Sequence, residues 1–222
     1  MGLSDSLRKQ SDCIWRKILA HPFVRGLGDG SLAVDRFAFY LRQDYLFLIE
    51  YGRVLALAAA KAPDLAGMRR FSQLMHATLT EEMELHRRYC AGFGISAGDL
   101  ERTRTAQATS AYTNFLLSAA YGGSIREIAA VLLPCQWGYC EIGLHLASTG
   151  DTSEANRYGE WIRTYSSPAF QELAAWLRGY LDHHGRRISR EERRRLGELF
   201  RTSSRYEYLF WDMGYRKETW PV

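Results

Sequence analysis

Cys135 is a residue whose type and position in the sequence could support covalent chemistry. It follows Pro134 inside a long apolar segment, and Tyr139 comes four residues later. A proline inside a helix removes one backbone hydrogen bond, and residues four apart share a helix face, so a hydroxyl would lie near the sulfur. A thiolate in such a setting is a nucleophile. Taken alone, however, a cysteine in an apolar helix is more often a small core residue.

The other three cysteines are even more strongly expected to be structural residues, because none has both a preceding proline and a tyrosine four residues later. They are Cys13, Cys90 and Cys140. No two of the four cysteines show Cys-x-x-Cys spacing, so a zinc site is not expected.

Asp44 is a second candidate because it shares a predicted helix face with aromatic residues. Phe47 and Tyr51 follow it at positions i+3 and i+7. A carboxylate on a buried face is costly unless it is paired or used in function. The alternative is that Asp44 lies at the rim of the core, or pairs with an arginine such as Arg42 or Arg53.

Glu207 lies in an aromatic segment, residues 206–211, and Phe210 shares its helix face. A buried carboxyl group is suited to general acid–base catalysis. In the alternative, Glu207 faces solvent and only the rings are buried. Tyr112 and Tyr165 are further possible hydrogen-bond donors, although each alone would be read as a core tyrosine.

A metal site is not predicted from the acidic residues and histidines. Glu82 and His86 are four residues apart, as are Glu141 and His145. The carboxylate-bridged di-iron bundles use Glu-x-x-His, with a spacing of three. We therefore interpret these pairs as hydrogen-bonding pairs, on the surface or between helices.

The elements that must position these side chains are predicted to be helices throughout. The 222 residues show helical periodicity broken by glycine and proline, and no strand-like alternation. Two capping boxes are expected, Ser124 with Glu127 and Ser189 with Glu192. We predict one all-α domain over residues 1–222, with a glycine loop at 26–30 and about eight helices. These are expected at residues 4–20, 35–61, 64–91, 99–121, 124–148, 152–164, 168–182 and 189–213.

Composition excludes several classes of function. The net charge is only +4, and acidic residues interrupt the densest basic stretch, residues 186–195, so nucleic-acid binding is not expected. The longest clean apolar run, residues 54–60, is too short to span a membrane. Residues 1–17 lack the apolar core of a signal peptide, which leads us to expect a cytoplasmic protein with reduced cysteines.

Five segments together resemble the thiaminase II, or TenA, family across nearly the whole chain. Each is unspecific alone, but their order and spacing match those of the family. They are residues 21–24, 39–48, 133–139, 161–167 and 206–211.

The resemblance implies a haem-oxygenase-like helical fold without haem or any other cofactor, and a homotetramer. It implies hydrolysis of 4-amino-5-aminomethyl-2-methylpyrimidine, or of thiamin, to the hydroxymethylpyrimidine used in thiamin salvage. By resemblance, Cys135 is the nucleophile, Glu207 the acid–base group and Asp44 the pyrimidine-binding carboxylate. The same resemblance assigns supporting or ring-stacking roles to Phe47, Tyr112, Tyr139, Tyr165 and Phe210. All of these residues are expected to converge on one enclosed pocket.

Two other functions remain open at this point. One is an oxidase of the same fold, either cofactorless like the pyrroloquinoline-quinone synthases or di-iron. The other is a pyrimidine-binding or regulatory protein without activity. The spacing of Glu and His argues against iron, and the presence of both Cys135 and Glu207 argues against mere binding.

Overall fold

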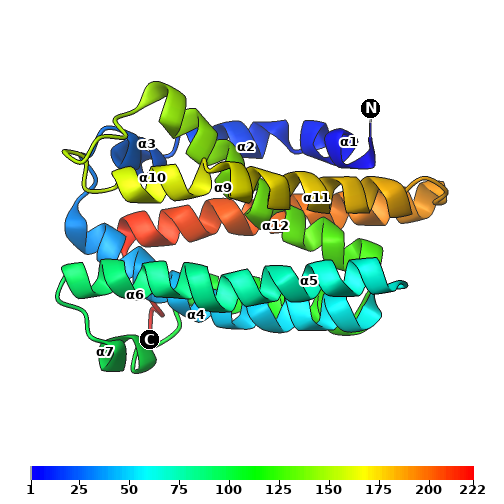
Figure 1. Cartoon of the computed structure of the whole chain (residues 1–222), viewed down its shortest axis with the longest axis horizontal. Helices are drawn as coiled ribbons and strands as arrows, with labels where there is room; N and C mark the ends of the chain where they lie inside the picture. Colours follow the sequence, from blue (N-terminus) through cyan, green and yellow to red (C-terminus); the bar gives the residue numbers. More distant parts are fainter. Residues whose placement is uncertain (1) are drawn as a thin grey trace. The chain divides into compact units, whose positions relative to one another are not determined.

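The computed structural model of this chain describes residues 2–222, which contain α-helices and no β-strand (Figure 1). This confirms the all-α prediction. The helices are α1 (Leu3–Gln10), α2 (Asp12–Leu19), α3 (Pro22–Gly28), α4 (Val34–Lys61), α5 (Leu65–Ala77), α6 (Met83–Gly92), α7 (Ala97–Glu101), α8 (Gln107–Gly122), α9 (Ile125–Thr149), α10 (Gly159–Tyr165), α11 (Pro168–His184) and α12 (Arg190–Arg216). A π-helical turn, η1 (Thr78–Glu82), joins α5 to α6. Within residues 2–222, no helix is long and apolar enough to cross a membrane.

The chain divides into two compact units, each built from two separate stretches of sequence. The first unit comprises the residues up to Ala33 and residues 129–212, and the second comprises residues 34–128 and 213–222. The expectation of a single domain over residues 1–222 stays a prediction.

In the first unit, α1 packs on α11, and α10 packs on both α3 and α11 (Figure 1). The largest buried side chains here include Trp161, Trp211 and Phe200. A close approach between α9 and α10 depends on Gly143, because a Cβ at this position would lie 2.5 Å from the carbonyl carbon of Tyr165. The glycine therefore lets α9 lie directly against the end of α10.

In the second unit, α4 is the central helix and packs on α5, α6 and α8. Buried Gln43 connects α4 to the segment before α8. Its Nε2 donates to the carbonyl of Arg104 at 3.0 Å, and its Oε1 accepts from the Ala106 backbone N–H at 2.8 Å and from the Thr109 hydroxyl at 2.9 Å. A buried amide with its hydrogen-bonding groups satisfied in this way aligns two helices without a polar penalty.

Residues 2–222 contain more helices than the eight predicted. The first predicted helix is interrupted at Ser11, the fourth at residues 102–106, and the sixth begins only at Gly159. The third is interrupted in its helical register by the π turn. The interruptions at Ser11, at residues 102–106 and at the π turn lie where no glycine or proline marks them in the sequence.

The glycine loop predicted at residues 26–30 is wrong, because Gly26 and Gly28 belong to α3. Pro22 occupies the first turn of that helix, where its missing N–H costs nothing, and the His21 ring accepts from the Phe23 N–H at 3.1 Å. Of the three glycines in this segment, Gly30 alone has the positive φ, +74°, of a loop glycine.

Both predicted capping boxes lie at helix starts. At α9, the Ser124 N–H donates to the Glu127 carboxylate at 2.6 Å, and the Glu127 N–H donates to the Ser124 hydroxyl at 3.4 Å. At α12, the Glu192 N–H donates to the Ser189 hydroxyl at 3.0 Å. These contacts set where α9, which carries Cys135, and α12, which carries Glu207, begin.

Candidate functional site

Cys135 lies in the middle of α9, one residue after Pro134, and its side chain is half-buried. The helix continues through the proline. Nearby, the Ser203 hydroxyl of α12 donates to the Val131 carbonyl at 2.7 Å, inside the core. This bond connects the backbone just before Cys135 to the helix that carries Glu207.

The other cysteines differ from Cys135 in exposure, because Cys13 is exposed and both Cys90 and Cys140 are buried. No disulfide joins the four cysteines. Burial raises the pKa of Cys90 to about 11, with Arg42 opposing weakly. Burial and the Glu141 charge raise the pKa of Cys140, against a smaller effect of Arg178. Thiols with raised pKa values are poorly ionised at neutral pH and are weak nucleophiles.

Tyr139, one helical turn after Cys135, belongs to a packed cluster of rings. Its ring centroid lies 4.9 Å from that of Tyr165, 5.9 Å from Trp161 and 5.1 Å from Trp211. Two of the predicted site residues, Tyr139 and Tyr165, are therefore in direct contact. Phe210, also predicted, is buried on α12 three residues after Glu207.

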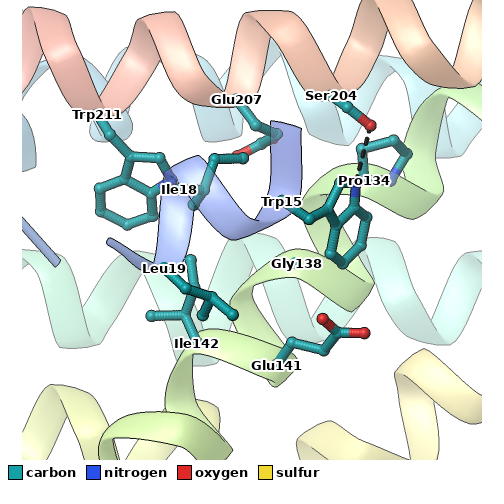
Figure 2. Close-up of a pocket in the computed structure, with 10 residues that line it drawn as sticks. All are labelled: Trp15, Ile18, Leu19, Pro134, Gly138, Glu141, Ile142, Ser204, Glu207 and Trp211. Carbon is teal, nitrogen blue, oxygen red and sulfur yellow. Dashed lines mark hydrogen bonds between the residues drawn. The ribbon is translucent and has the colours of Figure 1, made fainter. Parts of the chain in front are cut away.

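Glu207 is only 4% exposed, so the alternative that it faces solvent is wrong. It lines a small cavity of about 10 Å³ together with residues of α2, α9 and α12 (Figure 2). The lining is mostly apolar and includes Trp15, Ile18 and Trp211. The Trp15 indole N–H donates to the Ser204 hydroxyl at 3.0 Å, which closes one side of this cavity. A carboxyl group in such surroundings is poorly solvated and well suited to proton transfer.

Asp44, on α4, is 3% exposed and has two hydrogen-bonding partners in its own unit. The Tyr40 hydroxyl donates to its Oδ2 at 3.1 Å, and the Nε2 of His86 lies 2.6 Å from the same oxygen. The alternative of an arginine partner such as Arg42 or Arg53 is wrong, because the partners of the Asp44 carboxylate among residues 2–222 are a tyrosine and a histidine. Arg53 pairs with Glu50 instead. Phe47, one turn further along α4, contacts Tyr112 with ring centroids 5.1 Å apart.

His86 is the residue that sequence reasoning missed at this position. The sequence pairs His86 only with Glu82 at position i−4, and the backbone carbonyl of Glu82 lies 2.8 Å from His86 Nδ1. Its main partner is 42 residues away in sequence. No local spacing could have indicated this pair.

The two Glu and His pairs of the sequence do not form a metal cluster. Within residues 2–222, no group of three or more His, Cys, Asp or Glu side chains is arranged to hold a metal ion. Glu141 accepts from Arg8 at 2.9 Å, and His86 contacts Asp44.

The predicted site residues fall into two groups, one in each unit. Asp44, Phe47 and Tyr112 belong to the second unit, and the others belong to the first unit, namely Cys135, Tyr139, Tyr165, Glu207 and Phe210. The convergence of both groups on one pocket stays a prediction.

The helical fold of this chain is that of the haem-oxygenase-like proteins. A domain of unknown function with a haem-oxygenase-like fold from Shewanella denitrificans superposes with a TM-score of 0.73 at 15% identity, covering 96% of this chain and 92% of that one. The model of the TENA/THI-4/PQQC family matches residues 8–217. The chain therefore belongs to this family.

The chain is also similar to individual proteins over nearly its full length. The chain is 45% identical to an aminopyrimidine aminohydrolase of Halalkalibacterium halodurans, covering 99% of this chain and 98% of that protein. It is 41% identical to an aminopyrimidine aminohydrolase of Helicobacter pylori, covering 97% and 100%. A TenA homologue from Pyrococcus horikoshii superposes with a TM-score of 0.89 at 32% identity, covering 97% and 99%.

Proposed function

We propose that this chain is an aminopyrimidine aminohydrolase that converts 4-amino-5-aminomethyl-2-methylpyrimidine, or thiamin, to the hydroxymethylpyrimidine for thiamin salvage. The observation that carries the proposal is the full-length similarity to proteins of that name, at 34–45% identity. The chain also has a half-buried cysteine and a buried glutamate at the positions where the family resemblance requires a nucleophile and an acid–base group.

In the proposed mechanism, the Cys135 thiolate adds to C6 of the pyrimidine while Glu207 protonates a ring nitrogen. The addition breaks the aromaticity of the ring, and the electron pair moves toward C5. The leaving group then departs from the C5 methylene with the bonding electrons and takes up a proton. Dividing one difficult displacement into two steps is the advantage of covalent catalysis.

In the second half of the reaction, water adds to the exocyclic methylene that remains. One proton of this water returns to the base, the hydroxymethyl group forms, and the thiolate of Cys135 leaves from C6. Glu207 acts as acid and then as base in this cycle, as a carboxyl group near an apolar wall can do.

Binding is assigned to the remaining predicted residues. Asp44 accepts from the exocyclic amine, and Phe47 and Phe210 stack on the ring, which holds C6 near the sulfur. Tyr112, Tyr139 and Tyr165 supply hydroxyl groups around it. We also propose that the active form is a cytoplasmic homotetramer, as the family resemblance implies.

A direct test is steady-state hydrolysis by purified protein of the aminomethylpyrimidine and of thiamin, side by side. Release of hydroxymethylpyrimidine from either substrate is the expected result, and the ratio of the two kcat/KM values identifies the preferred leaving group. Oxygen consumption without hydrolysis would instead favour an oxidase of the same fold.

A further inference from the structure

A buried polar cluster in the second unit contains His86, to which the proposed mechanism gives no role. Tyr40 and Asp44 lie one turn apart on α4, and His86 comes from α6. The three side chains are almost inaccessible to solvent, with exposed fractions of 0%, 3% and 1%. Polar groups buried this deeply persist only when their hydrogen bonds are satisfied.

The partners of the His86 ring determine its protonation. Its Nδ1 lies 2.8 Å from the Glu82 backbone carbonyl, which can only accept, so Nδ1 carries a proton. Its Nε2 lies 2.6 Å from Asp44 Oδ2. In a neutral ring protonated at Nδ1, Nε2 would be an acceptor facing a carboxylate oxygen, which is repulsive. A proton on Nε2 removes that repulsion and makes a short, charge-assisted hydrogen bond.

Electrostatics act in the same direction. Burial by itself would lower the pKa of His86, but the charge and hydrogen bond of Asp44, with smaller contributions from Glu82, outweigh it and raise the pKa above its ordinary value. The geometry and the charges therefore agree on an imidazolium paired with a carboxylate.

The backbone before α6 contributes to the orientation of His86. The π turn η1 ends at Glu82, the residue whose carbonyl accepts from the ring. A π turn accommodates one extra residue, which rotates every later side chain by about 100° around the helix axis relative to a continuous α-helix. Such turns occur often at functional sites.

The arrangement leaves the two oxygens of Asp44 unequal. Oδ2 accepts from both Tyr40 and His86, and these are the hydrogen bonds that Asp44 makes among residues 2–222. Oδ1 therefore keeps its lone pairs available. A carboxylate held through one oxygen presents the other in a fixed direction as a pure acceptor.

We propose that His86 is a positioning residue that holds the Asp44 carboxylate through Oδ2, so that Oδ1 accepts from the exocyclic amine of an aminopyrimidine. This inference rests on the proposed function. It also predicts a specificity: a ring with a carbonyl oxygen in place of the amine would face Oδ1 as a second acceptor and be rejected.

The test compares His86→Leu and His86→Gln with the wild-type protein, and uses His145→Gln, at an exposed position of α9, as the control. Calorimetry gives the Kd of hydroxymethylpyrimidine and of its 4-oxo analogue. His86→Leu is expected to raise the Kd of the amine ligand about tenfold or more, because a charged hydrogen-bond partner of Asp44 is lost. It should also reduce the preference for amine over carbonyl. His86→Gln, which can still donate to Oδ2, should restore part of both.

Two results would overturn the inference. One is a folded His86→Leu variant that binds the amine ligand as the wild type does, with the same preference. The other is a measurement on wild-type protein with 15N-labelled histidine, in which the His86 ring loses one of its two protons at or below about pH 6.5, the ordinary pKa of histidine. The nitrogen spectrum decides the matter even if the variants do not fold. A wild-type protein that neither binds nor hydrolyses aminopyrimidines would refute the proposed function, whereas activity that is indifferent to His86 would refute only this inference.

Discussion

At the scale of single residues, Cys135 is distinguished from the other cysteines by its surroundings. We expect Cys135→Ser to fold and bind hydroxymethylpyrimidine but to lose turnover by on the order of 10³-fold or more, because an alcohol is far less ionised than a thiol. Hydrolysis of the aminomethylpyrimidine measures this loss. Cys140→Ala is the matched control on the same helix, with a thiol whose pKa is raised, and should keep most of the activity. Full activity in Cys135→Ser would shift the chemistry to Glu207 acting directly on water.

Glu207 supports a second prediction at this scale. Glu207→Gln keeps the shape of the side chain in its mostly apolar surroundings but removes the proton donor. We expect kcat to fall by about 10²–10⁴-fold, the usual contribution of a general acid or base, while ligand binding changes much less. A Gln variant with a normal kcat and a raised KM would show that Glu207 binds substrate and does not transfer protons.

At the scale of elements, the contact between α9 and α10 depends on a missing side chain. The Cβ of Gly143→Ala would lie 2.5 Å from the Tyr165 carbonyl carbon and 2.7 Å from the Ser166 nitrogen, and a backbone cannot move aside as a flexible side chain can. We expect a loss of about 1–3 kcal/mol in the free energy of unfolding, the usual cost of overpacking, measured by urea denaturation.

Gly179, inside α11, is the matched control for that variant. A Cβ there meets nothing within 4 Å, so Gly179→Ala should increase stability by about 0.5–1 kcal/mol through helix propensity alone. If both variants behaved alike, the close approach of α9 to α10 would not limit stability. A displaced α10 would also move Tyr165 away from Tyr139, so activity should fall with Gly143→Ala and not with Gly179→Ala.

At the scale of the whole molecule, the buried pair of His86 and Asp44 connects stability to pH. The pKa of His86 is raised on folding by Asp44 from α4 and Glu82 from the preceding turn, against burial, and Tyr40 is the other group in contact with the carboxylate. The stabilisation is therefore complete below the unfolded pKa of about 6.5. It is lost as the pH rises through the folded value, by at most about 1.4 kcal/mol per pH unit.

Thermal unfolding of wild type and His86→Gln over the same pH series measures this effect. Wild-type stability should fall more steeply with increasing pH above neutrality than that of the variant, because only the wild type must release the proton. Parallel curves would mean that His86 is already neutral in the folded protein.

The sequence by itself determined the features that depend on neighbouring residues. Helical periodicity indicated the all-α class, and the serine and glutamate three residues apart at the start of α9 placed that helix correctly. The shared face of Asp44 and Phe47 follows from their spacing on one helix. These features are local, and local hydrogen bonding and side-chain spacing are readable along the chain.

Only the tertiary structure decided the features that depend on residues distant in sequence. It assigned His86 to Asp44 in place of an arginine, buried Glu207 beside Trp15 and Trp211, and brought Tyr165 to Tyr139. It also distinguished the cysteines, since burial raises the pKa values of Cys90 and Cys140 while Cys135 stays half-buried. Burial and hydrogen bonding between helices arise from packing in three dimensions, and a buried carboxylate takes the nearest donor in space whatever its position in the chain.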